Sequence, residues 1–268
     1  MRPAGAATLA VLLIFSTARG TCRDAIAVAD SQAIAGGDRC GSGEGYLVRP
    51  LIFVPTDYQD YLADGRVAAF VKVAVEVIRS FYATNNAGRT FRLLPVDVVS
   101  ARHDRAYYWR GPNPNFEYQV LWELQERGYP VHVDWDRFPS DRVVLVFAMG
   151  GGGWAGGRHY PVGGGFAMVG DAVLLAGMDL NCDRVREEAA RKVCRESWLP
   201  SGHIYGFGVG AMAHELGHAF NLPHPPPGSP DWPRTVMGEH WNYPKTGLSD
   251  SDRSILATSC FFRERERR

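Results

Sequence analysis

The sequence has no excess of charge of either sign. Its 29 basic side chains are matched by 29 acidic ones, so the formal net charge is zero. No long-range field therefore favours nucleic acid or an anionic membrane as a partner. Beyond residue 20 the chain also lacks an apolar run of the roughly 20 residues that a membrane-spanning helix needs. We expect neither a nucleic-acid partner nor stable membrane insertion.

The glycine-rich stretch 150–157 lacks the features of a phosphate-binding loop. No Lys-Ser or Lys-Thr pair follows it, and its spacing fits no dinucleotide fingerprint. We therefore expect a mobile or tightly turned surface loop. The sequence does not indicate what role the glycine-rich insert 150–165 has.

The first 20 residues have the pattern of an export signal. Arg2 provides a positive charge, residues 6–15 form an apolar core too short to span a bilayer, and residues 16–20 offer small residues for cleavage. The sequence thus predicts a secreted, extracellular or periplasmic protein. Residues 21–45 are expected to form a loosely ordered lead-in, and residues 46–268 a single domain.

Five cysteines fit an oxidising compartment, where disulfide bonds persist. Cys182 and Cys194 can close the short charged stretch between them, and Cys22 and Cys40 can close the N-terminal segment. Cys260 would then be left over. Connectivity cannot be deduced from the sequence, so these pairings are two possibilities among several.

Apolar periodicity predicts alternating strands and helices. Strand, helix, strand, helix and strand follow one another up to residue 149, which implies parallel pairing through helical crossovers. The last of these strands is one apolar run, as is typical of a strand buried on both faces. The expected strands are 46–54, 91–99, 141–149, 166–169 and 172–178, and the expected helices are 61–83, 114–127, 184–196, 209–220 and 249–261. Ser249 is the expected cap of the last helix.

The most informative stretch is His-Glu-Leu-Gly-His-Ala-Phe-Asn-Leu-Pro-His, residues 214–224. His214 and His218 lie one helical turn apart, so both rings leave the same face and can reach one zinc ion. Glu215 projects beside that ion, where it can take a proton from a zinc-activated water. A catalytic zinc usually keeps three protein ligands and an open position, so a third ligand is required.

His224 can be that third ligand only if the helix ends and the chain reverses before it. The reversal should fall on Asn221, because such a helix end needs a positive φ, for which asparagine is second only to glycine. Pro223 then prevents the helix from resuming. Glu239 is an alternative third ligand, but it lies in a stretch rich in proline and tryptophan, so His224 is preferred. The other histidines have no metal-ligand spacing and are interpreted as ordinary: His103, His132, His159, His203 and His240.

Residues 214–224 resemble the zinc-binding signature H-E-x-x-H-x-x-G-x-x-H of the metzincin endopeptidases, with asparagine in place of glycine. The later stretch 235–238, Thr-Val-Met-Gly, resembles the Met-turn of that family, which would place Met237 beneath the zinc site. No tyrosine stands two residues after Met237, so the tyrosine ligand of some branches has no counterpart. Tyr243 lies nearby and is a candidate substrate-binding residue.

The resemblance implies an α+β, zincin-like fold. Its parts would be a twisted, mostly parallel sheet with an antiparallel edge strand, crossover helices, an active-site helix and a C-terminal helix. In such enzymes the edge strand pairs with an extended substrate, and residues 165–169 are the best match. An ordinary edge strand without that role is an equal alternative. The candidate substrate-binding residues on this strand are Gly165, Phe166, Ala167 and Met168.

The leading hypothesis is a secreted zinc endopeptidase whose catalytic domain is 46–268. One catalytic Zn²⁺ would activate a water, Glu215 would act as general base, and peptides or proteins would be the substrates. Two alternatives stay open. One is a zinc hydrolase of a non-peptide amide bond; the other is a catalytically silent zinc-containing binding protein, against which the intact Glu215 argues. The sequence indicates neither the preferred substrate, nor control by a propeptide or inhibitor, nor the oligomeric state.

Overall fold

The computed structural model describes residue 40 and residues 46–62, 65–110, 116–131, 141–151, 154–160, 163–171 and 206–263. Contacts group residues 39–268 into one unit. The expected export signal, most of the lead-in, and the elements expected at 172–178 and 184–196 lie outside the described residues and stay predictions. Among the helices that are described, none combines the length and the apolar character needed to cross a bilayer.

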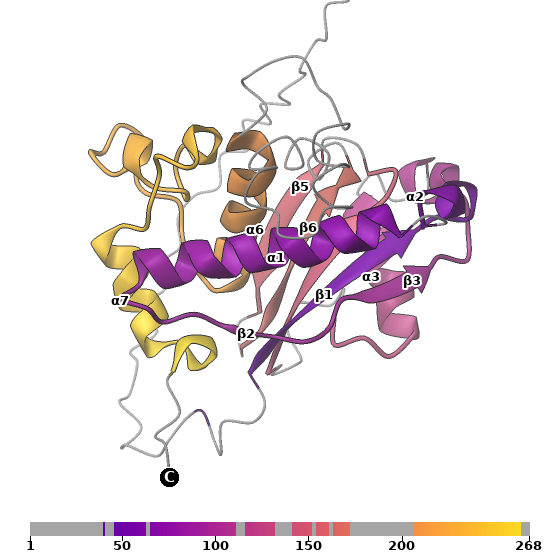
Figure 1. Cartoon of the computed structure of the whole chain (residues 1–268), viewed down its shortest axis with the longest axis horizontal. Coiled ribbons are helices and arrows are strands. Elements are labelled where there is room, and N and C mark those ends of the chain that lie inside the picture. Colours follow the sequence, from indigo (N-terminus) through magenta and orange to yellow (C-terminus); the bar gives the residue numbers. More distant parts are fainter. Residues whose placement is uncertain are drawn as a thin grey trace, which may run out of the picture. The chain divides into compact units, whose positions relative to one another are not determined.

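The described strands form one six-stranded sheet (Figure 1). Its order is β2-β1-β4-β6-β5, and β3 also pairs with β1. All pairs are parallel except that between β5 and β6, which is antiparallel. The strands are β1 Leu47–Val54, β2 Arg92–Leu93, β3 Asp97–Ser100, β4 Arg142–Ala148, β5 Ala155–His159 and β6 Gly165–Gly170. The mostly parallel sheet with an antiparallel edge strand is thereby confirmed.

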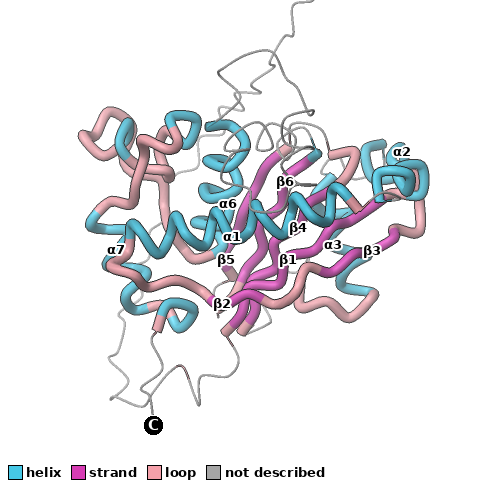
Figure 2. Tube along the Cα trace, viewed as in Figure 1, coloured by secondary structure: helices cyan, strands magenta, loops and turns pink. Residues whose placement is uncertain are grey.

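Helices pack on both faces of this sheet. The long helix α1 crosses one face in front of β1 (Figure 1), and α3 contributes to the apolar cluster on the other. Between α6 and α7 the chain is mostly loop and short turns (Figure 2). The α-helices are α1 Arg66–Asn85, α2 Arg105–Arg110, α3 Phe116–Glu126, α6 Ala211–Ala219 and α7 Asp250–Thr258. The other helical segments are η1 Thr56–Leu62, η3 Gly206–Gly210, η4 Trp232–Arg234, η5 His240–Asn242 and η6 Cys260–Phe262.

Alternate side chains of the central strands belong to two separate apolar clusters. Leu145 and Phe147 of β4 lie in the cluster that also contains residues of α1 and α6. Val144 and Val146 lie in the cluster that contains residues of α3. This alternation follows from the period of two in a β-strand. Because both faces of β4 are buried, its sequence is one continuous apolar run, as predicted.

Two expected elements differ from the structure. The single strand expected at 91–99 is interrupted, and β2 and β3 pair separately with β1. Pro95 lies between them and has no N–H to donate to a ladder. The loop expected at 150–157 is wrong in its second half, because Ala155–His159 forms the edge strand β5. The two glycines of β5 have low strand propensity, so the sequence pattern did not indicate a strand there.

The C-terminal helix begins as predicted. The Ser249 hydroxyl accepts a hydrogen bond from the Asp252 N–H at 3.0 Å, and the Asp252 carboxylate accepts one from the Ser249 N–H at 2.8 Å. These two bonds form a capping box, which satisfies two backbone donors at the helix start.

The disulfide of the described part of the chain joins Cys40 to Cys260, whose Cα atoms lie 5.4 Å apart. The expected pairing of Cys22 with Cys40 is therefore wrong, and Cys260 is not left over. The two partners are separated by 220 residues in sequence, so local spacing contained no sign of this bond. Cys182 and Cys194 lie outside the described residues.

Candidate metal centre

The helix that carries the first two histidines ends in a reversed turn. Asn221 has a φ of 70°, the left-handed conformation predicted for it. The Asn221 N–H bonds to the carbonyl of His218 at 2.9 Å, and the Leu222 N–H reaches back to the carbonyl of Gly217 at 2.9 Å. These bonds close the helix end, and the chain then returns towards its own last turn. His224 is thereby brought beside the helix.

The reversal brings the three predicted imidazoles together. Nε2 of His214 lies 3.0 Å from Nε2 of His218 and 3.1 Å from Nε2 of His224, and the remaining pair is 3.0 Å apart. Within the described residues this is the group able to hold a metal ion. The alternative ligand Glu239 is outside it, and its carboxylate accepts a hydrogen bond from the Asn242 side chain at 2.6 Å.

The hydrogen bonds of two rings determine which nitrogen is free to bind a cation. Nδ1 of His214 lies 2.8 Å from the Val236 carbonyl oxygen, and Nδ1 of His218 lies 3.0 Å from that of Leu222. A carbonyl oxygen only accepts, so each Nδ1 has the proton and each Nε2 of the neutral ring has a lone pair. Two lone pairs facing each other at 3.0 Å repel unless a cation lies between them. Together with Nε2 of His224, at 3.0–3.1 Å from both, these nitrogens are placed to bind a Zn²⁺ ion, which binds imidazole at about 2.0–2.1 Å.

Burial keeps these rings neutral near pH 7. Desolvation lowers the pKa of His214 to about 3, although its bond to Val236 acts in the opposite direction. Burial is also the main cause of the lowered pKa of His218 and of His224. Neutral imidazole is the form that binds metal. Exposure increases from buried His214 to exposed His224, so the group opens to solvent on the His224 side.

Glu215 lies beside this group and is only 8% exposed. Burial, and after it the negative charge of Glu117, raises the pKa of its carboxyl to about 8. Burial also raises the pKa of Glu117, while Arg158 lowers it. A dication at the three histidines would favour the ionised form of Glu215 again. Glu117 and Arg158 were not predicted, because they come from α3 and β5, far from the motif in sequence.

Small residues allow the surrounding elements to approach α6. A Cβ on Gly157 of β5 would lie 2.0 Å from the backbone oxygen of Glu215, and one on Gly217 would lie 2.4 Å from Sδ of Met237. Side chains at these glycines would therefore separate the edge strand and Met237 from the helix. Met237 is fully buried, and its neighbour Val236 provides the carbonyl that orients His214.

The strand expected to bind substrate at an open edge is an inner strand. β6 pairs with β4 on one side and with β5 on the other. Its residues Gly165–Gly170 are all buried. Gly165, Phe166, Ala167 and Met168 are thus not on an edge, and the reason for assigning substrate binding to them is wrong. Tyr243 follows η5 and packs on Phe81, with ring centroids 5.7 Å apart.

A fourth histidine lines the site. The ring of His240 lies 4.8 Å from that of His214. Burial, and then the charges of His224 and His218, lower its pKa to about 4. His240 is outside the group placed to hold a metal ion, but its ring lies against that group. Its position shortly after Met237 was the one signal of this in the sequence. Tryptophans flank the group as well: Trp232 lies 6.4 Å from His224, and Trp241, which is 47% exposed, lies 5.2 Å from His240.

Comparison with protein-family models gives no match, and comparison with curated proteins gives none either. Among solved structures, the chain is similar to the catalytically inactive OgpA from Akkermansia muciniphila, solved in complex with an O-glycopeptide (glycodrosocin) substrate. The two chains are 15% identical, with a TM-score of 0.48. The similarity covers 81% of this chain and 61% of OgpA, so this chain spans less than two thirds of the length of OgpA. A similarity of this size says nothing of activity.

Proposed function

We propose that this protein is a zinc-dependent endopeptidase. The observation that supports the proposal best is the convergence of three Nε2 atoms, those of His214, His218 and His224, at 3.0–3.1 Å from one another. Two of these rings have their Nδ1 atoms committed to backbone carbonyls. The Nε2 lone pairs of these two rings therefore face each other, which supports a cation bound between them and His224.

The three histidines would hold one zinc ion. When bound there, zinc would lower the pKa of a water molecule to about 7 and polarise a substrate carbonyl. The exposure of His224 supports a catalytic centre with an open position, because structural zinc sites are closed by a fourth protein ligand. Met237 would support the group from below, as its packing against Gly217 suggests.

Glu215 would be the general base. Successive helix positions differ by about 100° in direction, so Glu215 cannot approach the ion as its neighbour His214 does. It takes one proton from water while the water oxygen bonds to the peptide carbonyl carbon and the C=O π pair moves to the carbonyl oxygen. When the C–N bond breaks, Glu215 gives this proton to the leaving nitrogen. The products are a carboxylic acid and an amine.

The edge strand β5, rather than β6, would hold the substrate. It is antiparallel to β6 and packs on α6 through Gly157, next to Glu215. A peptide that adds to such an edge is held by its backbone. Export is part of the proposal, and the Cys40–Cys260 bond supports it, because disulfides persist in oxidising compartments.

The test is cleavage of an unbiased peptide library by the purified protein. We expect cleavage with zinc, loss of cleavage with a chelator, and recovery when zinc is restored. The variant Glu215→Gln keeps the size of the side chain but cannot take a proton, so it should bind zinc and cleave about 10²–10⁴ times more slowly. A zinc-loaded parent that cleaves no peptide, or a Glu215→Gln variant as fast as the parent, would show that the proposal is wrong.

Zinc content provides the matched control for the ligands. His224→Ala should lose the one zinc per chain, whereas Glu239→Ala should keep it, because its carboxylate is engaged with Asn242 outside the group. The opposite result would assign the third ligand to Glu239 and contradict the site as described.

A further inference from the structure

His240 lies beside the three-histidine group without belonging to it. Its ring centroid is 4.8 Å from that of His214, and the two ring planes are tilted by 54°. The group whose ligand atoms lie within 4.8 Å of one another contains His214, His218 and His224, but not His240. His240 therefore faces the proposed centre from a place where it does not act as a ligand.

The backbone holds His240 firmly in this place. The preceding N–H, that of Glu239, bonds to the carbonyls of Trp232 and Thr235 at 3.1 Å, which ties η5 to the turn before Met237. On the other side, a Cβ on Gly210 would lie 2.0 Å from the His240 carbonyl oxygen. Gly210 immediately precedes α6, so the start of the ligand-bearing helix packs directly against the His240 backbone. Such fixed placement is what a preorganised donor requires.

The chemistry of an imidazole suits a donor here. In either protonation state the ring keeps at least one N–H. During peptide hydrolysis negative charge develops on the carbonyl oxygen, and a donor fixed in a partly buried site stabilises that charge strongly. Among the described residues, the indole of Trp232 also lies near the group, but its centroid is 6.4 Å from that of His224. His240 is the nearer donor.

We propose that His240 is a catalytic residue that donates an N–H hydrogen bond to the carbonyl oxygen of the scissile peptide. The inference rests on the proposed peptidase function. As the water oxygen bonds to the carbonyl carbon, the C=O π pair moves to this oxygen and the hydrogen bond to it strengthens. No proton passes to or from His240, so Glu215 remains the base. Removal of one such donor lowers kcat about 10²–10³-fold in other hydrolases.

The test compares two variants of equal size, His240→Gln, which keeps an N–H donor, and His240→Met, which has none. We expect one zinc per chain in both, a KM close to that of the parent, and a kcat for His240→Met about 10²–10³-fold below the parent. The kcat of His240→Gln should lie between that of the parent and that of His240→Met. His103→Ala is the control, because the His103 ring stacks on Tyr107, at 3.8 Å, in a different part of the fold.

A binding measurement separates this role from a structural one. A phosphinic peptide, which imitates the tetrahedral intermediate, should bind His240→Met more weakly than the parent by the same factor as the loss of kcat. An intact peptide should bind Glu215→Gln and the double variant Glu215→Gln/His240→Met equally well.

Three results would overturn the inference: loss of zinc in both His240 variants, equal kcat of the two variants, or unchanged affinity of His240→Met for the phosphinic peptide. In each of these cases a parent that cleaves peptides leaves the proposed function standing. A zinc-loaded parent that cleaves no peptide would instead overturn the proposed function, and the role of His240 with it.

Discussion

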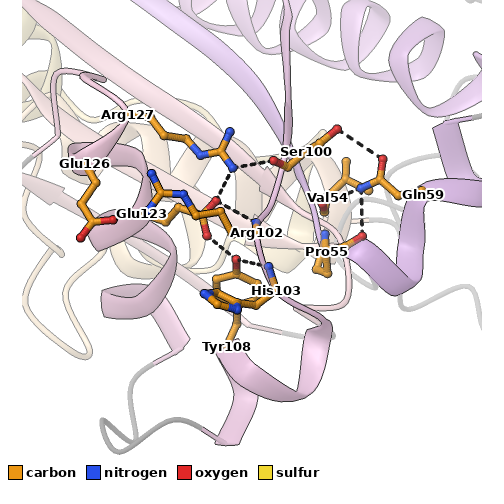
Figure 3. A network of polar contacts seen from close by, with 10 residues as sticks. All are labelled: Val54, Pro55, Gln59, Ser100, Arg102, His103, Tyr108, Glu123, Glu126 and Arg127. Carbon is orange, nitrogen blue, oxygen red and sulfur yellow. Dashed lines mark hydrogen bonds and ion pairs between the residues drawn. The ribbon is translucent and has the colours of Figure 1, made fainter.

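Two of the buried polar groups in the described part of the fold differ in one respect: only one of them is complete by itself. The first surrounds Glu123 of α3 (Figure 3). This residue is 4% exposed. Its carboxylate accepts hydrogen bonds from the Arg102 backbone N–H at 3.0 Å, from the Arg127 guanidinium at 2.6 Å and from the Tyr108 hydroxyl. Every strong acceptor has a donor, so the group needs nothing from outside.

The second group is the set of three histidines, where lone pairs face lone pairs. No donor lies between the Nε2 atoms of His214 and His218, whose protons are held at Nδ1 by the carbonyls of Val236 and Leu222. Buried polar groups are normally satisfied, so an incomplete one marks a place where a ligand belongs. The comparison teaches that burial and polarity alone do not identify a site. A buried polar group that lacks a partner within the protein is what identifies a site.

The largest effect on stability is expected at the complete group. Glu123→Leu keeps the volume but leaves the Tyr108 hydroxyl and the Arg102 N–H without their acceptor inside the protein. We expect a loss of about 3 kcal/mol in the free energy of unfolding, measured by urea denaturation. Zinc content and kcat should stay those of the parent, because this group lies against the α3 cluster rather than α6. Loss of zinc in this variant would show that the two groups are coupled.

The metal site could be predicted from the sequence because its ligands are local. Residues 214–224 contain all three histidines and the reversal at Asn221, so helix geometry and one turn are enough to assemble them. The central strand β4 could be predicted equally well, because a strand that is buried on both faces has a continuous apolar sequence. The alternation of strands and helices then implied the parallel order of the sheet.

The rest of the site depends on elements that meet only in the fold. Glu117 of α3 raises the pKa of Glu215, and Arg158 of β5 lowers that of Glu117. Both residues are far from Glu215 in sequence, so no local spacing could predict these effects. The edge strand itself contains Gly157, whose lack of a side chain allows the close approach to α6, and Gly156, which lies against the Trp154 ring. His240 comes shortly after Met237, and no repeat or motif in the sequence marks it.

A smaller effect is expected from pH in the metal-free protein. The pKa of Glu215 is raised in the fold, to about 8, so between the unfolded value of about 4.3 and this value the folded state binds more protons than the unfolded one. Its contribution to stability is therefore present at low pH and is lost as pH rises to 8. Glu215→Gln removes this loss. At pH 8 the free energy of unfolding of the chelated variant should therefore exceed that of the chelated parent by roughly 1–3 kcal/mol.

The difference should shrink at pH 5, where the parent carboxyl is protonated in the fold. The histidines act in the opposite direction, because the lowered pKa of His214 costs stability as pH falls below about 6.5. Both proteins contain them, so they cancel in the comparison. Urea denaturation of both chelated proteins at pH 5 and pH 8 measures the effect. An equal difference at the two pH values would show that Glu215 is not the group that titrates.

The smallest effect is expected at the helix end that completes the ligand set. Asn221 at φ 70° and Ala87 at φ 50° are the non-glycine residues with positive φ in the described chain, and each follows the end of a helix. Alanine has no side-chain amide to offset the strain of this conformation, whereas asparagine tolerates it. Ala87→Gly should therefore stabilise the protein by up to about 1 kcal/mol, and Asn221→Gly should change stability by at most about 0.5 kcal/mol. Both variants should keep zinc and activity, measured alongside urea denaturation.

Asn221→Val cannot adopt this φ without strain, so it should lower stability and zinc affinity together. Full zinc affinity in Asn221→Val would show that the reversal at residue 221 is not what brings His224 to the other two histidines.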